Sequence, residues 1–207
     1  MFSAHAKVRG PTEGAGFAMR VIAGRFKGRR LRAPKGYDVR PTSDKVRSAL
    51  FSILGSRIER ARVMDLFAGT GSVGVEALSR GAAHVLFVED DTAARTSLEA
   101  NLAACGVDAR EATVWSGRGV AGLIRYLKAH PEETADLIFA DPPYRHHEAL
   151  RLLRPFVAGL GLAKGGYLVV EHAHGAHLPP PEPPVALAKT YRYGDTVLSI
   201  FERETPA

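Results

Sequence analysis

Residues 65–74 read Asp-Leu-Phe-Ala-Gly-Thr-Gly-Ser-Val-Gly, and they begin inside an apolar run that covers 63–67. A short apolar run that passes through a glycine-rich turn into a helix is typical of the first strand of an open α/β sheet, where ligands bind at the turn. Gly69 and Gly71 lack a Cβ atom, so their backbone can approach a ligand closely. The spacing Gly69-x-Gly71-x-x-Gly74 also fits the dinucleotide fingerprint, so by itself it does not identify the ligand.

The same pattern of strand and helix repeats through the rest of the chain. Strands are expected at 63–67, 85–88, 112–115, 137–140 and 167–170, with helices at 73–80, 92–104, 118–129 and 146–160. Short apolar strands that alternate with helices indicate a parallel sheet covered on both faces. Near the end of the chain, two strand-like stretches flank the turn residues Gly194 and Asp195. They predict a hairpin over 188–201 that makes one edge of the sheet antiparallel.

Ahead of the sheet, the chain is expected to divide into a tail and an extension. Residues 1–18 show no periodicity and are predicted to be a disordered tail. Residues 19–60 are predicted to be a basic extension made of a hairpin and a helix, and Thr42 or Ser43 is expected to cap that helix. Residues 61–207 then form the α/β domain.

The composition is that of an ordinary globular protein. Hydrophobic residues make up 45% of the 207 residues and charged residues 24%, and no apolar run is long enough for a membrane-spanning helix. Cys105 is the single cysteine, so an internal disulfide is excluded and a reducing compartment suits the chain. The start of the chain lacks the apolar core of a signal peptide. We therefore expect a cytoplasmic protein.

The positive charge is concentrated at the front of the chain. Residues 1–62 hold 15 of the 28 Lys and Arg residues but four of the 22 Asp and Glu residues. This asymmetry predicts a segment that binds a polyanion such as RNA, and the alternative is a solvated surface in an arginine-rich protein. The candidate RNA-binding residues are Arg20, Arg25, Lys27, Arg29, Arg30, Arg32 and Arg40.

Two acidic residues favour one adenosine-type ligand over another. Glu89 ends the second strand, where its carboxylate can accept a ribose hydroxyl, but enzymes that bind NAD need the same feature. Asp65 precedes Gly69, where a carboxylate suits the ammonium group of a methionine moiety and sits badly beside a pyrophosphate. The sequence therefore favours S-adenosylmethionine over NAD. On this interpretation, Gly71→Val should fold and lose the cofactor.

The stretch that ends the fourth strand reads Leu137-Ile-Phe-Ala-Asp-Pro-Pro-Tyr144. Two prolines remove two backbone N–H donors and fix both φ angles. What remains is a rigid set of acceptors, namely the Asp141 carboxylate and the Pro142 carbonyl. These acceptors suit the two hydrogens of an amino group on a base, and Tyr144 offers a flat face on which the base can stack. The motif therefore indicates methylation of an amino group.

Three segments resemble the RsmD-type 16S ribosomal RNA guanine-N2 methyltransferases, and the resemblance covers residues 19–202. They are Arg20-Val-Ile-Ala-Gly24 with Gly28-Arg-Arg-Leu31, then Arg40-Pro-Thr-Ser-Asp-Lys-Val-Arg-Ser-Ala-Leu-Phe51, and Asp65–Arg80 with Asp141–Tyr144. The resemblance implies a Rossmann-like class I methyltransferase domain over 61–207, with a seven-stranded, mostly parallel sheet. It implies S-adenosyl-L-methionine as cofactor, S-adenosyl-L-homocysteine as product and no metal.

The resemblance also assigns site residues. Asp141, Pro142, Pro143 and Tyr144 would hold the target base. Ser116 stands where relatives read the adenine, although the stretch 115–118 offers no acid there. The partner implied is 16S ribosomal RNA in the small subunit or its assembly intermediate, bound by a monomer. The residues implied in cofactor binding are Asp65, Phe67, Gly69, Thr70, Gly71, Glu89, Asp90 and Ser116.

Three other functions are weighed against this one. A DNA adenine-N6 methyltransferase uses the same Asp-Pro-Pro-Tyr motif to hold an amino group, but no extra target-recognition domain is expected in this short chain. A non-catalytic ribosome-assembly factor would bind RNA through the basic front and would not need Asp141. An NAD-dependent reductase fits Asp65 and 141–144 poorly. A metal site at His172-x-His174-x-x-His177 is not favoured, and a solvated loop is expected there.

Overall fold

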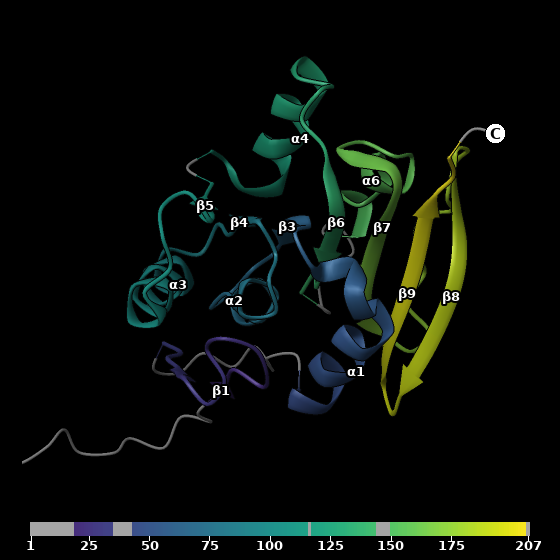
Figure 1. Ribbon diagram of the computed structural model, residues 1–207. Helices are drawn as coiled ribbons and strands as arrows, with labels where there is room; N and C mark the ends of the chain where they lie inside the picture. Colours follow the sequence, from purple (N-terminus) through teal and green to yellow (C-terminus); the bar gives the residue numbers. More distant parts are fainter. Residues whose placement is uncertain (1–18, 35–42, 116, 144–149, 206–207) are drawn as a thin grey trace, which may run out of the picture.

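The computed structural model describes residues 19–34, 43–115, 117–143 and 150–205 (Figure 1). A seven-stranded sheet forms its centre, in the order β5-β4-β3-β6-β7-β9-β8. β5, β4, β3, β6 and β7 are parallel, and β9 runs antiparallel to both β7 and β8. This confirms the predicted Rossmann-like sheet with an antiparallel C-terminal hairpin. The strands are β3 (Arg62–Leu66), β4 (His84–Val88), β5 (Ala112–Val114), β6 (Ala135–Ala140), β7 (Leu162–Ala173), β8 (Val185–Tyr193) and β9 (Thr196–Arg203).

Helices cover both faces of this sheet, as the apolar strands require. Successive side chains of a strand point to opposite faces, so Val63 joins one core cluster and Met64 the other. The first cluster packs under α1 (Asp44–Leu54), α2 (Ser72–Ser79) and α3 (Thr92–Cys105). The second packs under α4 (Gly119–Ala129) and α6 (Arg154–Val157). The predicted core position of Cys105 is confirmed.

Two predicted elements differ from the structure. In the described part of the predicted helix 146–160, residues 150 and 151 are helical and a turn follows at 152–153. A separate short helix, α6, then begins at Arg154, and Pro155 lies in its first turn, where a missing N–H is tolerated. β7 runs from Leu162 to Ala173, well beyond the predicted 167–170, because β9 pairs with it as far as Ala173. The histidine-rich stretch therefore begins inside a strand, and the expected loop at His172 was wrong.

The N-terminal extension packs on the outer side of α2. β1 (Met19–Arg20) and β2 (Arg30–Leu31) form the expected small hairpin. The carboxylate of Glu76, which is fully buried, accepts the N–H groups of Ile22 (2.7 Å) and Ala23 (3.0 Å). Gly24 has a φ of 80°, and a Cβ there would lie 1.8 Å from the Ser79 carbonyl oxygen. Close packing against α2 thus requires glycine at this position.

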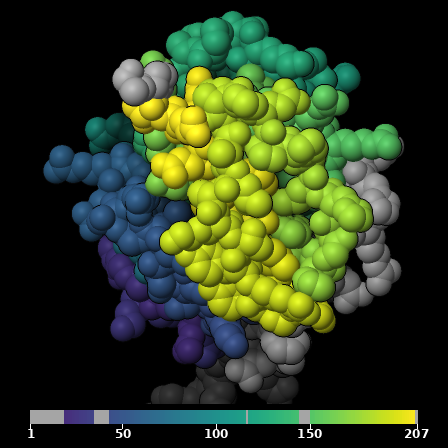
Figure 2. Space-filling view, turned by 90° about the vertical axis from the view of Figure 1, so that its right-hand side faces the viewer, coloured from purple at the N-terminus to yellow at the C-terminus, as the bar shows by residue number. Residues whose placement is uncertain are grey.

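The helix of the extension, α1, begins as predicted. The Ser43 hydroxyl accepts the N–H of Val46 (3.3 Å), which selects Ser43 over Thr42 as the cap. Val46, Leu50 and Leu54 are buried on one face. Figure 2 shows α1 beside the β8–β9 hairpin, with β8 at the exposed edge of the sheet. No helix in the described ranges is both long enough and apolar enough to cross a membrane.

Candidate active site

The strand register gathers most of the predicted site residues at one edge of the sheet. Leu66 of β3 lies beside Val88 of β4 and beside Ala140 of β6. The three segments that follow these strands therefore meet at their carboxyl ends, where open α/β sheets bind ligands. They are the glycine loop (residues 67–71), Glu89–Asp90 and Asp141–Pro143.

The glycine loop turns back on itself through left-handed backbone. Gly69 (φ 56°) and Gly71 (φ 80°) adopt this conformation easily, and Gly71 caps α2. Phe67 is also left-handed (φ 60°), which for a residue with a side chain costs about 1–3 kcal/mol. Strain of this kind is concentrated at ligand clamps and active sites. It supports a binding role for the loop.

Glu89 holds the glycine loop from the neighbouring strand. One oxygen of its carboxylate accepts the N–H of Gly69 (2.6 Å), and the other accepts the N–H of Asp91 (2.7 Å). Asp90 is exposed, and a Cβ at Gly119 would lie 2.1 Å from its carboxylate, so the start of α4 approaches Asp90 closely. Glu89 therefore sets the shape of the loop besides being a candidate ribose ligand.

Asp65 lies beneath the loop and is almost completely buried. Only 2% of its surface is exposed, and its carboxylate accepts the N–H of Gly74 (2.9 Å) in the first turn of α2. Burial raises the pKa of Asp65 to about 7, and the nearby Glu89 carboxylate acts on the pKa in the same direction. A buried acid in this state gains ionic stabilisation from a cationic group placed beside it. Asp65 therefore fits a ligand that carries an ammonium group.

Gly71 is required for a different reason from the one expected. A Cβ at Gly71 would lie 2.2 Å from Cδ1 of Leu98 in α3, so the space belongs to the protein core. Gly74 is similar, since a Cβ there would lie 2.2 Å from the ring of Phe87. The expectation that Gly71→Val folds normally therefore needs correction.

We now expect Gly71→Val to destabilise the fold. The valine would have to displace Leu98 and adopt a left-handed backbone, and overpacking a core alone costs about 1–3 kcal/mol. Chemical denaturation should show a fall in the free energy of unfolding of at least ~2 kcal/mol. Exposed Gly28, which is also left-handed but has open space at its Cβ position, offers a control in Gly28→Val. Equal losses in the two variants would show that contact with Leu98 is unimportant.

Asn101 is a site residue that the sequence analysis missed. It is fully buried in α3, and its amide joins the glycine loop to the basic extension. Its Nδ2 donates to the carbonyls of Thr70 (2.9 Å) and Arg32 (3.0 Å), and its Oδ1 accepts the N–H of Arg32 (2.8 Å). An asparagine within a helical pattern does not indicate that its side chain bonds to residues so distant in sequence.

The Asp-Pro-Pro segment continues β6 past its last paired residue. The N–H of Asp141 donates to the carbonyl of Leu66 (3.4 Å), which holds the segment beside the start of the glycine loop. Asp141 is half-buried, Pro142 is buried and Pro143 is exposed. Neither proline can donate a hydrogen bond, so at residues 142 and 143 the backbone offers acceptors alone. The predicted Tyr144, Ser116 and Arg40 lie outside the described residues.

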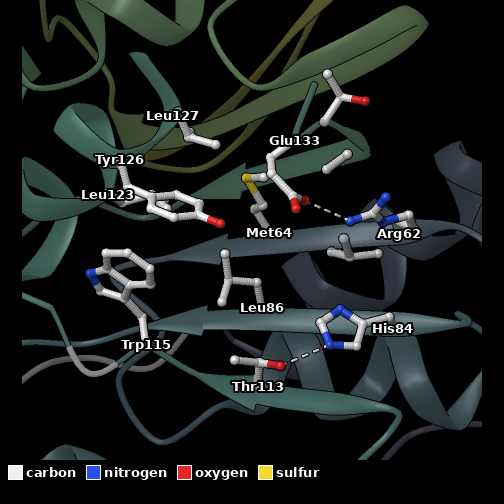
Figure 3. A pocket seen from close by; sticks show the side chains of 13 residues that line it. Arg62, Met64, His84, Leu86, Thr113, Trp115, Leu123, Tyr126, Leu127 and Glu133 are labelled. Carbon is white, nitrogen blue, oxygen red and sulfur yellow. Dashed lines mark hydrogen bonds and ion pairs between the residues drawn. The ribbon is translucent and has the colours of Figure 1, made fainter. Parts of the chain in front are cut away.

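A separate cavity lies under α4, away from this edge (Figure 3). Its volume is about 230 Å³, and its lining runs back to Arg62 and His84 at the amino-terminal ends of β3 and β4. Arg62 forms an ion pair with Glu133 (3.1 Å), and His84 shares a hydrogen bond with Thr113 (3.0 Å). None of the predicted cofactor or base ligands that the structure describes lines it.

Five of the predicted RNA-binding side chains of the extension fall into two groups. Arg25 forms an ion pair with Glu111 (2.7 Å), and Arg29 donates to the carbonyl of Ala104 (2.8 Å), so both also bind α3 and the segment after it. By contrast, Lys27, Arg30 and Arg32 are exposed, and within the described ranges their side chains form no hydrogen bond or ion pair.

Arg47 was not predicted to have a special role, yet its side chain is fully buried. Its guanidinium donates to the carbonyl of Arg20 (2.6 Å) and to Asp44 (2.7 Å), and burial lowers its pKa. It therefore fastens β1 to the start of α1.

No group of three or more metal-binding side chains occurs among the described residues. His172, in the histidine-rich stretch, instead shares a hydrogen bond with the hydroxyl of Ser199 (2.8 Å) inside the sheet.

Known proteins resemble this chain over most of its length. The family model described as conserved hypothetical protein 95 matches residues 19–202. YlbH of Bacillus subtilis strain 168 is 35% identical over 185 residues, which are 89% of this chain and 99% of that protein. Ribosomal RNA small subunit methyltransferase D of Escherichia coli K12 is 36% identical over 146 residues, 69% of this chain and 70% of that protein. Among solved structures, a hypothetical protein of Thermus thermophilus superposes with a TM-score of 0.73 at 30% identity, over 88% of this chain and 98% of that one.

Proposed function

Because the chain belongs to the RsmD-type methyltransferase family, we propose that it methylates the N2 amino group of a guanine in the 16S RNA of the small ribosomal subunit, with S-adenosylmethionine as methyl donor. One observation carries the proposal: the strand register brings the glycine loop, Glu89 and the Asp-Pro-Pro segment to one edge of the sheet. The substrate class is supported by the Escherichia coli relative, whose name is ribosomal RNA small subunit methyltransferase D.

The residues around the glycine loop fit S-adenosylmethionine. The buried Asp65 carboxylate would receive the ammonium of the methionine part. Both oxygens of Glu89 accept backbone N–H groups, and each keeps a second lone pair for a ribose hydroxyl. Bound there, the cofactor would supply an electrophilic methyl group and would leave with the electron pair of the S–CH3 bond. Phe67, Gly69, Thr70, Gly71, Asp90 and Ser116 complete the proposed cofactor site.

The Asp-Pro-Pro segment would hold the amino group that receives the methyl. The target nucleotide is flipped out of its stack, and the Asp141 carboxylate and the Pro142 carbonyl accept its two amino hydrogens. The N2 lone pair is then free to form the new N–C bond. Asp141 takes the proton that N2 loses and passes it to water. Pro143 keeps the segment rigid, and Tyr144 would stack on the base.

The exposed basic side chains of the extension would contact the phosphates. Replacing Lys27, Arg30 and Arg32 together by alanine should flatten the slope of log affinity against log salt by about two units, because each contact to single-stranded RNA contributes about 0.7. Filter binding to small-subunit RNA across salt concentrations measures this slope. A control that removes Arg125, Lys128 and Lys164, which are exposed elsewhere, should leave the slope unchanged. Two equally flattened slopes would contradict the assignment.

Two other functions are distinguished by one assay. Transfer of labelled methyl groups is measured with small-subunit RNA, ribosomal particles and duplex DNA in parallel. We expect label in the RNA samples alone. Label in DNA would favour the adenine-N6 alternative, and binding of RNA with no transfer would favour a non-catalytic assembly factor.

A further inference from the structure

A surface pocket lies between the segments that follow β6 and β7. Its volume is about 340 Å³, and its lining residues are Leu150, Arg151, His177, Leu178 and Pro179. The first two follow the Asp-Pro-Pro segment along the chain, and the other three follow β7. β6 and β7 are neighbouring parallel strands (Figure 1), so both segments leave the sheet at its carboxyl edge. The pocket is therefore on the side of the candidate active site.

The order of the strands places the Asp-Pro-Pro segment between the cofactor residues and this pocket. In the sheet, β4, β3, β6 and β7 are consecutive. The glycine loop follows β3 and Glu89 follows β4, whereas His177 follows β7. A base held at Asp141 would thus have the cofactor on one side and the pocket on the other. The RNA chain that continues from this base would pass on the side of the pocket.

The two polar side chains of the pocket are accessible and unengaged. Arg151 and His177 are exposed, and among the described residues neither side chain forms a hydrogen bond or an ion pair. By contrast, Arg154 forms an ion pair with Glu182 (3.6 Å), and His174 shares a hydrogen bond with an arginine of β8 (3.0 Å). A ligand can therefore reach the guanidinium and the imidazole of the pocket without displacing a bond within the described protein.

The rest of the pocket lining is apolar. Leu150 and Leu178 are half-buried against the core cluster under α4 and α6, and Pro179 is half-buried as well. The volume lies at the lower end of the range for small-ligand sites, which is ~300–1,000 Å³. An apolar hollow with one cation and one aromatic ring fits a flat base that is attached to a phosphate, because bases stack on histidine and phosphates pair with arginine.

Resting on the proposed function, we propose that this pocket binds a nucleotide next to the target guanine, with His177 stacking on its base and Arg151 contacting its phosphate. Enzymes that flip a nucleotide out of its stack also contact the nucleotides on either side of it, and these contacts set the preferred sequence context. The pocket would hold the RNA chain beside the flipped guanine. It would add affinity for RNA without touching the reacting atoms.

The test removes the neighbouring base and the pocket side chains in one thermodynamic cycle. Small-subunit RNA, in the free or assembled form that wild type methylates, carries an abasic residue on the 5′ or the 3′ side of the mapped target guanine. One of these two abasic residues should weaken binding to wild type at least ~5-fold, as expected for the loss of one stacked base. The double variant Arg151→Ala with His177→Ala should bind unmodified RNA at least ~10-fold more weakly. The same abasic residue should then weaken its binding by less than about twofold further.

The matched control is Arg154→Ala with His174→Ala, which removes the same two residue types from the same segments outside the pocket lining. It should bind RNA like wild type and keep the full effect of the abasic residue. His177→Phe, which keeps a flat ring, should keep that effect too. Cofactor affinity and the transfer rate at saturating RNA should stay within about threefold of wild type in every variant, because the lost contacts concern RNA binding alone.

The outcomes separate the two proposals. Wild type that transfers no methyl to guanine N2 would overturn the proposed function and the role of the pocket with it. If wild type methylates guanine N2 and neither abasic residue weakens its binding, the role of the pocket alone is overturned. An abasic residue that weakens the double variant as much as wild type has the same meaning. So does a control variant that loses as much affinity as the double variant.

Discussion

Asp141→Ala is expected to slow methyl transfer at least ~10–100-fold, because a hydrogen bond to a charged group contributes about 1.5–3 kcal/mol and each ~1.4 kcal/mol of barrier is tenfold in rate. The variant should fold, since Asp141 is half-buried at the end of β6 and the backbone bond of its N–H to Leu66 does not depend on the side chain. Cofactor affinity should change by less than about twofold, because Asp65 and the glycine loop are intact.

The measurement is single-turnover transfer at saturating cofactor, with cofactor affinity taken separately by calorimetry. Asp136→Ala is a matched control, because Asp136 lies at the opposite end of the same strand, where its carboxylate accepts the N–H of Arg62 (2.8 Å). Asp141→Asn keeps one acceptor without the charge and should fall between wild type and alanine. A rate for Asp141→Ala close to that of wild type would contradict the assigned role of Asp141.

Asp65→Asn is expected to make the free protein more stable at neutral pH and to weaken cofactor binding by ~10–100-fold. The pKa of Asp65 is raised from 3.8 to about 7 by burial, so the folded state binds the proton more tightly than the unfolded state. Wild type therefore loses stability as the pH rises from about 4 to about 7, by on the order of 4 kcal/mol in total. Asparagine has no charge to bury, and its carbonyl can still accept the N–H of Gly74. In Asp65→Asn, the loss of stability between about pH 4 and pH 7 should therefore disappear.

Cofactor affinity should show the opposite dependence on pH. The ionised form of Asp65 is the one that receives an ammonium group, so the affinity of wild type should rise as the pH approaches about 7 and then level off. Chemical denaturation and calorimetry between pH 5 and pH 8 test both trends, with Glu99→Asn as an exposed control. A variant that is less stable at pH 8 than wild type, or that binds the cofactor equally well, would show that Asp65 does not act as a buried charge facing the methionine part.

Local patterns were sufficient for most of the fold. Three short sequence signals each mark the end of a strand and the functional loop that follows it. They are the glycine spacing after Asp65, the acid at Glu89 and the paired prolines after Asp141. Each signal lies within ten residues of sequence. Parallel strands then bring the three segments to one edge, because all of them end in the same direction. The prediction of the parallel sheet and of the site edge therefore needed little beyond strand and helix periods.

Features that depend on distant partners were beyond the sequence. Asn101 bonds to Arg32 and Thr70, which are 69 and 31 residues away. The space beside Gly71 is filled by Leu98, so a position assigned to ligand approach also reflects packing. His172 was expected to lie in a loop, and it belongs to β7 because β9 pairs with β7 as far as Ala173. Each of these errors concerns a contact between two secondary-structure elements that are distant in sequence.

The central claim is tested most directly by the modified nucleoside itself. Small ribosomal subunits from cells that lack this protein are incubated with the purified protein and labelled S-adenosylmethionine, and the RNA is digested to nucleosides for mass spectrometry. The account predicts label in N2-methylguanosine from one position of the 16S RNA, and none with Asp141→Ala. Label in N6-methyladenosine, or in no nucleoside while the protein still binds the particles, would contradict it.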